Sequence, residues 1–209
     1  MSSVPSKRLL SDIRAARATM EADTRAALLG AAATVLREEG PSVLTVRRVA
    51  DAVNASTKMI YTHFGGKDGL LDALYLHSFA GLTREFQAYS GVLDPVLRLD
   101  NMVMAYRAFA LSEPALYNVM FGDLGRAWEA PPKSRRQAWR SFETVRDVVR
   151  LCLPPARSSE ARRSTYLLWA AMHGVVSLEL RKLLGSAGDG EQLYHLAVAA
   201  VREAQGLKR

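Results

Sequence analysis

The spacing of apolar residues constrains the fold of this chain more than any other sequence feature. Apolar side chains recur every three to four residues over most of the length, and no segment shows the β-branched alternation that is typical of strands. Glycine and proline interrupt this pattern at Gly40-Pro41, Gly65-Gly66, Pro131-Pro132, Pro154-Pro155 and 185–190. We therefore predict an all-α protein whose helices end at these breaks.

Polar residues mark the ends of three helices near the N-terminus. The first helix is expected to begin after Asp23 or Thr24, and Thr45 and Ser56 are expected to cap two short helices, because their side-chain oxygens accept bonds from free backbone amides. Asn54 tolerates a positive φ, so it is suited to the tight turn between the short helices.

Longer apolar stretches follow Gly91 and predict a second helical domain. Further helices are expected at about 67–89, 95–111, 114–121, 133–152, 159–184 and 190–205. The expected parts of the chain are a basic tail at 1–20, a first domain at 21–81 and a second domain at 92–209.

The net charge of +7 suggests a polyanionic partner, but its location matters more than its sum. Residues 21–80 contain six basic and seven acidic side chains, so the first domain is nearly neutral. Charge alone is therefore weak support for nucleic-acid binding. The tail, with Lys7, Arg8, Arg14 and Arg17, is expected to be either a disordered solubilising segment or an arm that enters a DNA minor groove.

Several classes of protein are disfavoured by the sequence. The longest nearly apolar stretch, 166–180, is shorter than the roughly 18 to 20 residues that span a bilayer, so we predict no membrane partner. The N-terminus lacks the apolar segment of a secretory signal, which favours the cytoplasm. Cys152 is the only cysteine and is expected to be a buried apolar group. Hydrolase, metalloprotease and phosphate-loop motifs are absent, so we predict no enzyme activity, no metal and no cofactor.

Residues 45–64 have the spacing of a helix-turn-helix. In the second of the two short helices, Thr57 with Tyr61 and Lys58 with Thr62 form i, i+4 pairs on the face opposite the apolar residues. Such a polar face suits a DNA major groove, where Lys58 can donate to guanine, Thr57 can bond a base or phosphate, and Tyr61 can pack on a thymine methyl.

Residues at the ends of these helices are candidates for phosphate contacts. Thr45, His63 and Lys67 lie where side chains and free amides suit phosphate oxygens. Arg47 is either a further DNA contact or a solvated surface arginine.

Residues 45–71 resemble the helix-turn-helix of TetR-type (tetracycline-repressor-like) regulators. The resemblance covers about 21–81 and is carried by residues at the family's spacing: Ser56, Ile60-Tyr61, His63-Phe64, Lys67 and Leu70-Leu71. It implies a homodimer whose recognition helices enter successive major grooves of DNA. In that arrangement Tyr61, His63 and Lys67 contact the DNA backbone, and Thr57 and Lys58 contact bases. Asn54 stands where the family usually has glycine. Residues 169–174, with 113–121, resemble a WHG-type C-terminal domain.

The helix expected at 159–184 is apolar nearly all round in its middle, so both of its sides must be covered. We predict that it and the last helix pair with their symmetry mates as a four-helix bundle, which in turn predicts a near-palindromic operator. Candidate interface residues are Ala170, Ala171, Gly174, Leu178, Leu193, Leu196, Ala197, Ala200 and Val201.

The second domain is rich in aromatic residues and methionine, which form either a packed core or a pocket for a small apolar or aromatic effector. The pocket candidates are Met102, Tyr106, Phe109, Tyr117, Phe121, Trp139, Phe142, Trp169 and His173. His173 is either a hydrogen-bonded structural histidine or a ligand contact.

These observations predict a homodimeric, DNA-binding transcriptional regulator that acts as a repressor and leaves its double-stranded operator when a small effector binds. The alternative is a helical ligand-binding or partner-binding protein that has lost specific DNA binding.

Overall fold

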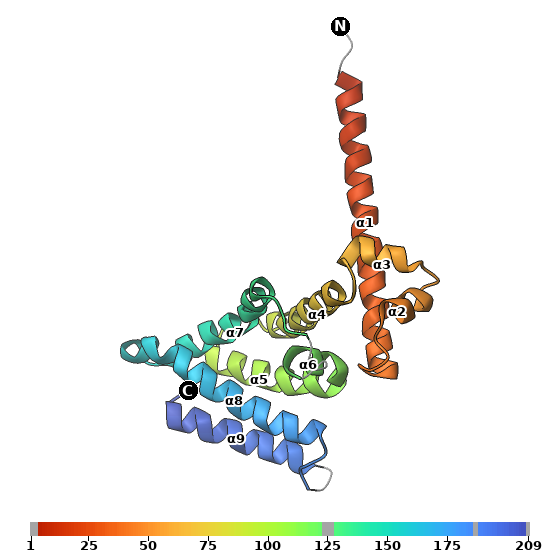
Figure 1. Cartoon of the computed structure of the whole chain (residues 1–209). Helices are drawn as coiled ribbons and strands as arrows, with labels where there is room; N and C mark the ends of the chain where they lie inside the picture. The colour runs from red at the N-terminus through yellow and green to blue at the C-terminus, as the bar shows by residue number, and fades with distance from the viewer. Residues whose placement is uncertain (1–3, 123–127, 186–187, 208–209) are drawn as a thin grey trace. The chain divides into compact units, whose positions relative to one another are not determined.

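The computed structural model describes residues 4–122, 128–185 and 188–207, with side chains from Arg8 onward. All regular structure within these ranges is helical, which confirms the predicted all-α class. The chain divides into two compact units, unit 1 up to Leu74 and unit 2 from Tyr75 onward (Figure 1).

Unit 1 is built on the C-terminal half of α1 (Val4–Glu39), against which α2 (Val46–Ala52) and α3 (Thr57–Phe64) pack (Figure 1). The first turns of α4 (Lys67–Gln87) complete it. Its core consists of apolar side chains at helical spacing from all four elements, and these include Leu28, Ala32, Leu36, Val49, Ile60, Phe64, Leu70 and Leu74. Burial of these residues fixes α3 with one face inward and one face outward.

The predicted start of α1 is wrong, because the helix begins at Val4 and not after Asp23 or Thr24. Instead of capping, the Thr24 hydroxyl donates to the Met20 carbonyl oxygen at 2.8 Å, a bond that is available inside a helix. The described part of the tail is therefore drawn as helix from Val4 onward. Every side chain from Arg8 to Asp23 is exposed, and Lys7 lies outside the described side chains.

The junctions around α2 and α3 match the predicted turn chemistry with one exception. Thr45 Oγ1 accepts the backbone N–H of Arg48 at 3.1 Å, which confirms the predicted cap. Asn54 has the expected positive φ of 52°. Ser56 occupies the N-cap position of α3 with extended backbone, but its side chain makes no capping hydrogen bond, so that predicted role is wrong.

Unit 2 contains the rest of α4 and then α5 (Pro95–Ser112), α6 (Pro114–Phe121), α7 (Pro132–Cys152), a 3-10 helix (Pro155–Glu160), α8 (Ala161–Leu180) and α9 (Asp189–Gln205). Proline opens α5, α6 and α7, where a missing amide hydrogen costs nothing. The helix predicted at 159–184 is shorter, because its first residues form the 3-10 helix and Lys182 adopts a positive φ of 57°.

Helix α5 lies against α6, α7 and α8, and α8 and α9 run side by side (Figure 1). A buried hydrogen bond holds α9 to α5, and a partly buried ion pair holds α8 to α5. The Tyr194 hydroxyl donates to the Val103 carbonyl oxygen at 2.6 Å, and Arg107 forms a two-pronged ion pair with Glu179 at 2.7 and 3.0 Å. Among the described residues, none of the helices has the length and hydropathy that a membrane span needs.

Candidate nucleic-acid interface and ligand cavity

Helix α3 presents an exposed polar face opposite its buried residues. Ile60 and Phe64 are buried, whereas Thr57, Lys58, Tyr61 and Thr62 are all exposed, as the spacing predicts. Within the described ranges Lys58 makes no ion pair, so its ammonium group is open to a ligand. The Thr62 hydroxyl donates to the Lys58 carbonyl oxygen at 2.9 Å, which leaves its lone pairs for a donor.

Two contacts hold the C-terminal end of α3 in place. The Arg25 guanidinium lies 4.6 Å from the centre of the Phe64 ring, a cation–π contact that joins α1 to α3. The Tyr61 ring lies over Gly66, where an added Cβ would come within 3.3 Å of it. Gly65 and Gly66 have φ values of 75° and 128°, which only glycine adopts readily, so α3 ends sharply before α4.

The predicted helix-end residues have different surroundings. Thr45 and Lys67 are exposed and His63 is half-buried. Arg47 is exposed and lies 3.9 Å from Asp51, a loose surface pair that a phosphate can replace. Arg48 Nε donates to Glu39 at 2.9 Å, and this ion pair with α1 gives Arg48 a structural role.

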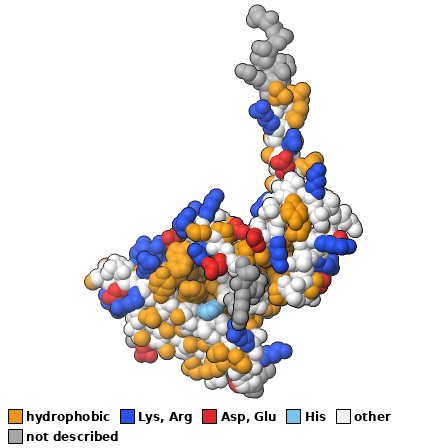
Figure 2. All heavy atoms as spheres, viewed as in Figure 1, with side chains coloured by type: hydrophobic (Ala, Val, Ile, Leu, Met, Phe, Trp, Pro, Cys, Tyr) orange, Lys and Arg blue, Asp and Glu red, His pale blue; other side chains and the backbone are white. Residues whose placement is uncertain are grey.

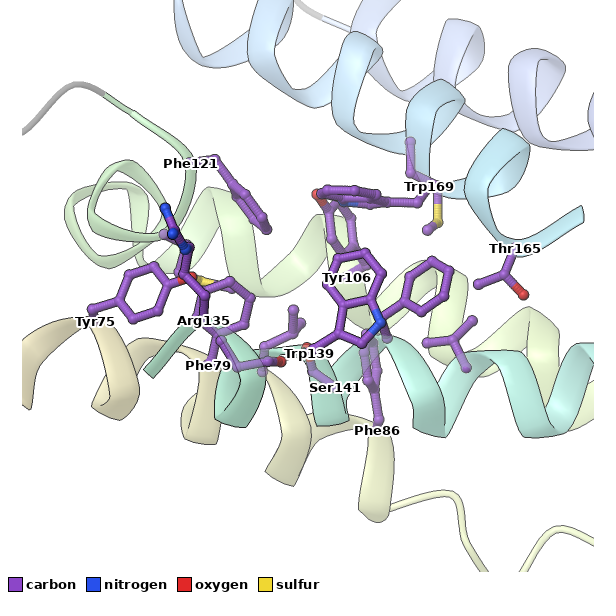
Figure 3. Close-up of a pocket in the computed structure, with 16 residues that line it drawn as sticks. Tyr75, Phe79, Phe86, Tyr106, Phe121, Arg135, Trp139, Ser141, Thr165 and Trp169 are labelled. Atoms are coloured by element: carbon purple, nitrogen blue, oxygen red, sulfur yellow. Dashed lines mark hydrogen bonds between the residues drawn. The ribbon is translucent and has the colours of Figure 1, made fainter. Parts of the chain in front are cut away.

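Unit 2 contains a partly open cavity of about 230 Å³ between α4, α5, α6, α7 and α8. Figure 3 shows its aromatic wall and places Arg135 and Thr165 at opposite ends. The lining residues are Tyr75, Phe79, Leu82, Phe86, Tyr106, Met120, Phe121, Arg135, Ala138, Trp139, Ser141, Phe142, Val145, Thr165, Trp169 and Met172. The rings pack on one another: Trp139 stacks on Phe142 at 4.5 Å, and Phe79 meets Phe121 edge-on at 5.5 Å.

A chain of hydrogen bonds runs from the cavity wall into α8. The Trp169 indole N–H can only donate, and it lies 3.3 Å from the Tyr106 oxygen. The Tyr106 and Tyr117 hydroxyl oxygens lie 2.8 Å apart, and the Tyr117 hydroxyl oxygen lies 2.6 Å from His173 Nδ1. On the other side of the ring, His173 Nε2 lies 3.3 Å from Ser177 Oγ.

Burial keeps this network in one protonation state. Desolvation raises the pKa of the Tyr117 hydroxyl to about 12 and raises the pKa of Tyr106 further. Desolvation, assisted by the positive charge of Arg181, lowers the pKa of His173, so the imidazole is neutral at pH 7.

Five of the nine sequence-predicted pocket residues line the cavity: Tyr106, Phe121, Trp139, Phe142 and Trp169. The other four do not. Met102 and Phe109 are buried in packed parts of unit 2 away from the lining. Tyr117 and His173 lie behind the wall, where they support Tyr106.

The wall that α4 contributes was missed by the sequence analysis. Tyr75, Phe79, Leu82 and Phe86 line the cavity and recur at intervals of four, three and four residues. This apolar stripe is visible in the sequence, and it marks one face of α4 as buried in unit 2.

The residues predicted to form a dimer interface lie on the open side of the α8–α9 pair. Ala170, Gly174, Leu178, Leu193, Leu196 and Ala200 are exposed, and Ala171, Ala197 and Val201 are half-buried. Leu196 is 59% exposed, which is high for leucine in a helix of a folded unit. Hydrophobic side chains gather over this part of the surface in Figure 2.

Two family models match the chain. One, described as bacterial regulatory proteins of the tetR family, matches residues 28–74, and the other, a tetracyclin repressor-like C-terminal domain, matches residues 99–201. The chain belongs to the TetR family. As a TetR-family protein with the DNA-binding domain of that family, it is a DNA-binding transcriptional regulator. The WHG resemblance of residues 169–174 stays a prediction.

Solved structures share the fold of this TetR-family chain at low identity. SCO4313, designated a regulatory protein, is 23% identical with a TM-score of 0.74, and the match covers 88% of this chain and 97% of that one. PfmR of Thermus thermophilus, a TetR-family transcriptional regulator, is 21% identical (TM-score 0.58; 87% and 96% covered). RolR, solved with resorcinol, is 17% identical (TM-score 0.60; 91% and 95% covered). No curated protein matches the chain.

Proposed function

We propose that this regulator is a homodimeric, non-enzymatic cytoplasmic repressor that leaves a near-palindromic operator when a small molecule occupies the cavity of unit 2. The observation that carries the proposal is the cavity itself, a partly open aromatic space of about 230 Å³. A folded core normally fills such space, because interiors pack as densely as organic crystals. The cavity is also larger than the roughly 150 Å³ cavity that holds benzene in an engineered protein. RolR, which has the same fold, was solved with the small aromatic ligand resorcinol.

The route from cavity to DNA runs through α4. Its residues from Tyr75 to Phe86 form one wall of the cavity, and its first residue, Lys67, follows α3 by two glycines. A ligand that fits only one position of this wall shifts the population of α4 positions by its differential affinity. That shift changes the spacing of the two reading helices, and operator affinity falls with it.

The DNA contacts are assigned to the exposed face and ends of α3. Thr57 and Lys58 read bases, Tyr61 packs on a base or contacts the backbone, and His63 and Lys67 contact phosphates. Four further residues on or beside this face are also assigned as DNA contacts: Ser56, Thr62, Thr45 and Arg47. A two-fold dimer through α8 and α9 brings two such helices to successive major grooves.

The test begins with selection of bound fragments from genomic DNA, followed by band-shift titrations with the selected site. Tyr61→Ala should weaken specific binding at least tenfold, because it removes a large exposed contact of α3. Tyr89→Ala, at a half-buried tyrosine of unit 2 outside the cavity, is the matched control and should bind as the parent does. If no fragment is enriched at any salt concentration, a partner-binding protein that has lost specific DNA recognition is the better account.

A further inference from the structure

Among the described residues that line the cavity, Arg135 alone has a charged side chain. It lies in the first turns of α7, at one end of the cavity, beside Tyr75 and Phe79 (Figure 3). Its guanidinium is half-exposed, so it keeps its hydration while the rest of the cavity is apolar. The cavity is thus an aromatic slot with a cationic end.

The ion pair that Arg135 makes is a weak one. Its Nη1 lies 3.7 Å from Glu129 Oε2, beyond hydrogen-bond distance, and the Glu129 side chain is 89% exposed. Exposed pairs of this kind contribute little, so a ligand anion displaces Glu129 at low cost. A carboxylate can bond the guanidinium through two parallel N–H donors, which Glu129 does not do here.

Every other polar group of the described lining residues is neutral, and four of them already use their hydrogens within the protein. The Trp169 N–H and the Tyr106 hydroxyl are committed to the network described above. The Ser141 hydroxyl donates to the Ala138 carbonyl oxygen at 2.9 Å, and the Thr165 hydroxyl to the Ala161 carbonyl oxygen at 2.7 Å. A ligand acceptor placed at the Thr165 end of the cavity, away from Arg135, would therefore find no free hydroxyl donor there, and an unsatisfied acceptor is costly in an apolar site.

We propose that the cavity binds an aryl carboxylate, with the ring held between the aromatic walls and the carboxylate at Arg135. This inference rests on the proposed function, since it names the ligand class of the same cavity. Its volume of about 230 Å³ suits a single substituted ring with the acid group at the cationic end. Neutral ligands of the same shape lose the charge-assisted bonds and gain nothing elsewhere in the wall.

The test uses 4-ethylbenzoate and its uncharged analogue 4-ethylbenzamide, which have nearly the same shape. Calorimetric titration of the full chain without DNA at pH 7.5 measures both. We expect the carboxylate to bind about tenfold more tightly than the amide, because a bidentate bond to a guanidinium is among the stronger polar contacts. Arg135→Gln should remove this preference, weakening the carboxylate about tenfold and changing the amide less than about twofold.

Arg136→Gln is the matched control, because Arg136 is the exposed neighbour on α7 that does not line the cavity. It should leave the affinity for both probes unchanged. The inference is overturned if the amide binds as tightly as the carboxylate, if both arginine variants have the same effect, or if neither probe binds below about 1 mM. If the carboxylate binds as expected and operator affinity does not respond, effector release is wrong and the ligand class stands.

Discussion

Acid should destabilise this protein through His173 before its carboxylates titrate. In the folded chain, burial and the positive charge of Arg181 lower the pKa of His173, whose Nδ1 lies 2.6 Å from the Tyr117 hydroxyl oxygen. The unfolded histidine titrates near pH 6.5. Below that pH His173 is protonated in the unfolded state but stays neutral in the folded state, so the free energy of unfolding falls as pH falls.

The magnitude follows from one proton. Between the unfolded pKa and the lower folded pKa, each pH unit removes up to about 1.4 kcal/mol of stability. His77 has a pKa lowered mainly by burial and also by Arg84, although Glu113 opposes the shift, so the parent protein carries a second contribution of the same sign.

Urea denaturation at pH 7.5, 6.5 and 5.5, at one fixed protomer concentration, measures the effect. His173→Gln keeps a polar side chain but cannot take up a proton, so its stability should fall less steeply with decreasing pH than that of the parent. His195→Gln, at an exposed histidine, should follow the parent. If the free energy of unfolding falls equally with pH in the parent and in His173→Gln, the loss of stability does not come from His173 and the assignment is refuted.

Three further predictions concern single side chains outside the cavity. Thr45→Ala should lower the free energy of unfolding by about 1 kcal/mol, because the hydroxyl caps α2, whereas Ser56→Ala, which removes no cap, should change it by less than about 0.5 kcal/mol in the same urea assay. Lys67→Gln should reduce the slope of log operator affinity against log salt by about 1.8, because a dimer would lose one phosphate contact in each subunit, and an unchanged slope would exclude that contact. Lys58→Ala should alter the sequence preference of the protein when the fragment selection is repeated. Leu196→Asp should convert the dimer to monomers in sedimentation velocity, because it places a charge in the predicted apolar interface, and a variant that stays dimeric would contradict that interface.

Local signals made unit 1 predictable. Asn54, Gly65 and Gly66 sit where positive φ values are needed, and the spacing of Ile60 and Phe64 leaves only one face of α3 for solvent. Each of these features depends only on residues a few positions apart in the chain. The exposed face of α3 could therefore be predicted from the sequence without knowledge of tertiary contacts.

The cavity was harder to predict because it depends on which faces of several helices meet. Helix α5 is apolar on more than one side, so its sequence does not distinguish Tyr106, which lines the cavity, from Met102, which packs elsewhere. The stripe on α4 is visible in the sequence, but its spacing alone does not show which helices that face meets. Arg135 carries no local signal, because Arg136, Arg140 and Arg150 follow it on α7 and are exposed as well.

Helix α1 is continuous in its hydrogen bonds but not in its packing. From Leu28 onward its apolar residues belong to the core of unit 1, whereas Leu9, Ile13 and Met20 form an uncovered stripe. Segments without tertiary contacts open at little free-energy cost, and isolated helices of this length are marginal in water. The two parts of α1 therefore differ in local stability. Any molecule that covers the stripe is linked thermodynamically to the folding of residues 4–27, about seven helical turns that continue directly into the core of unit 1.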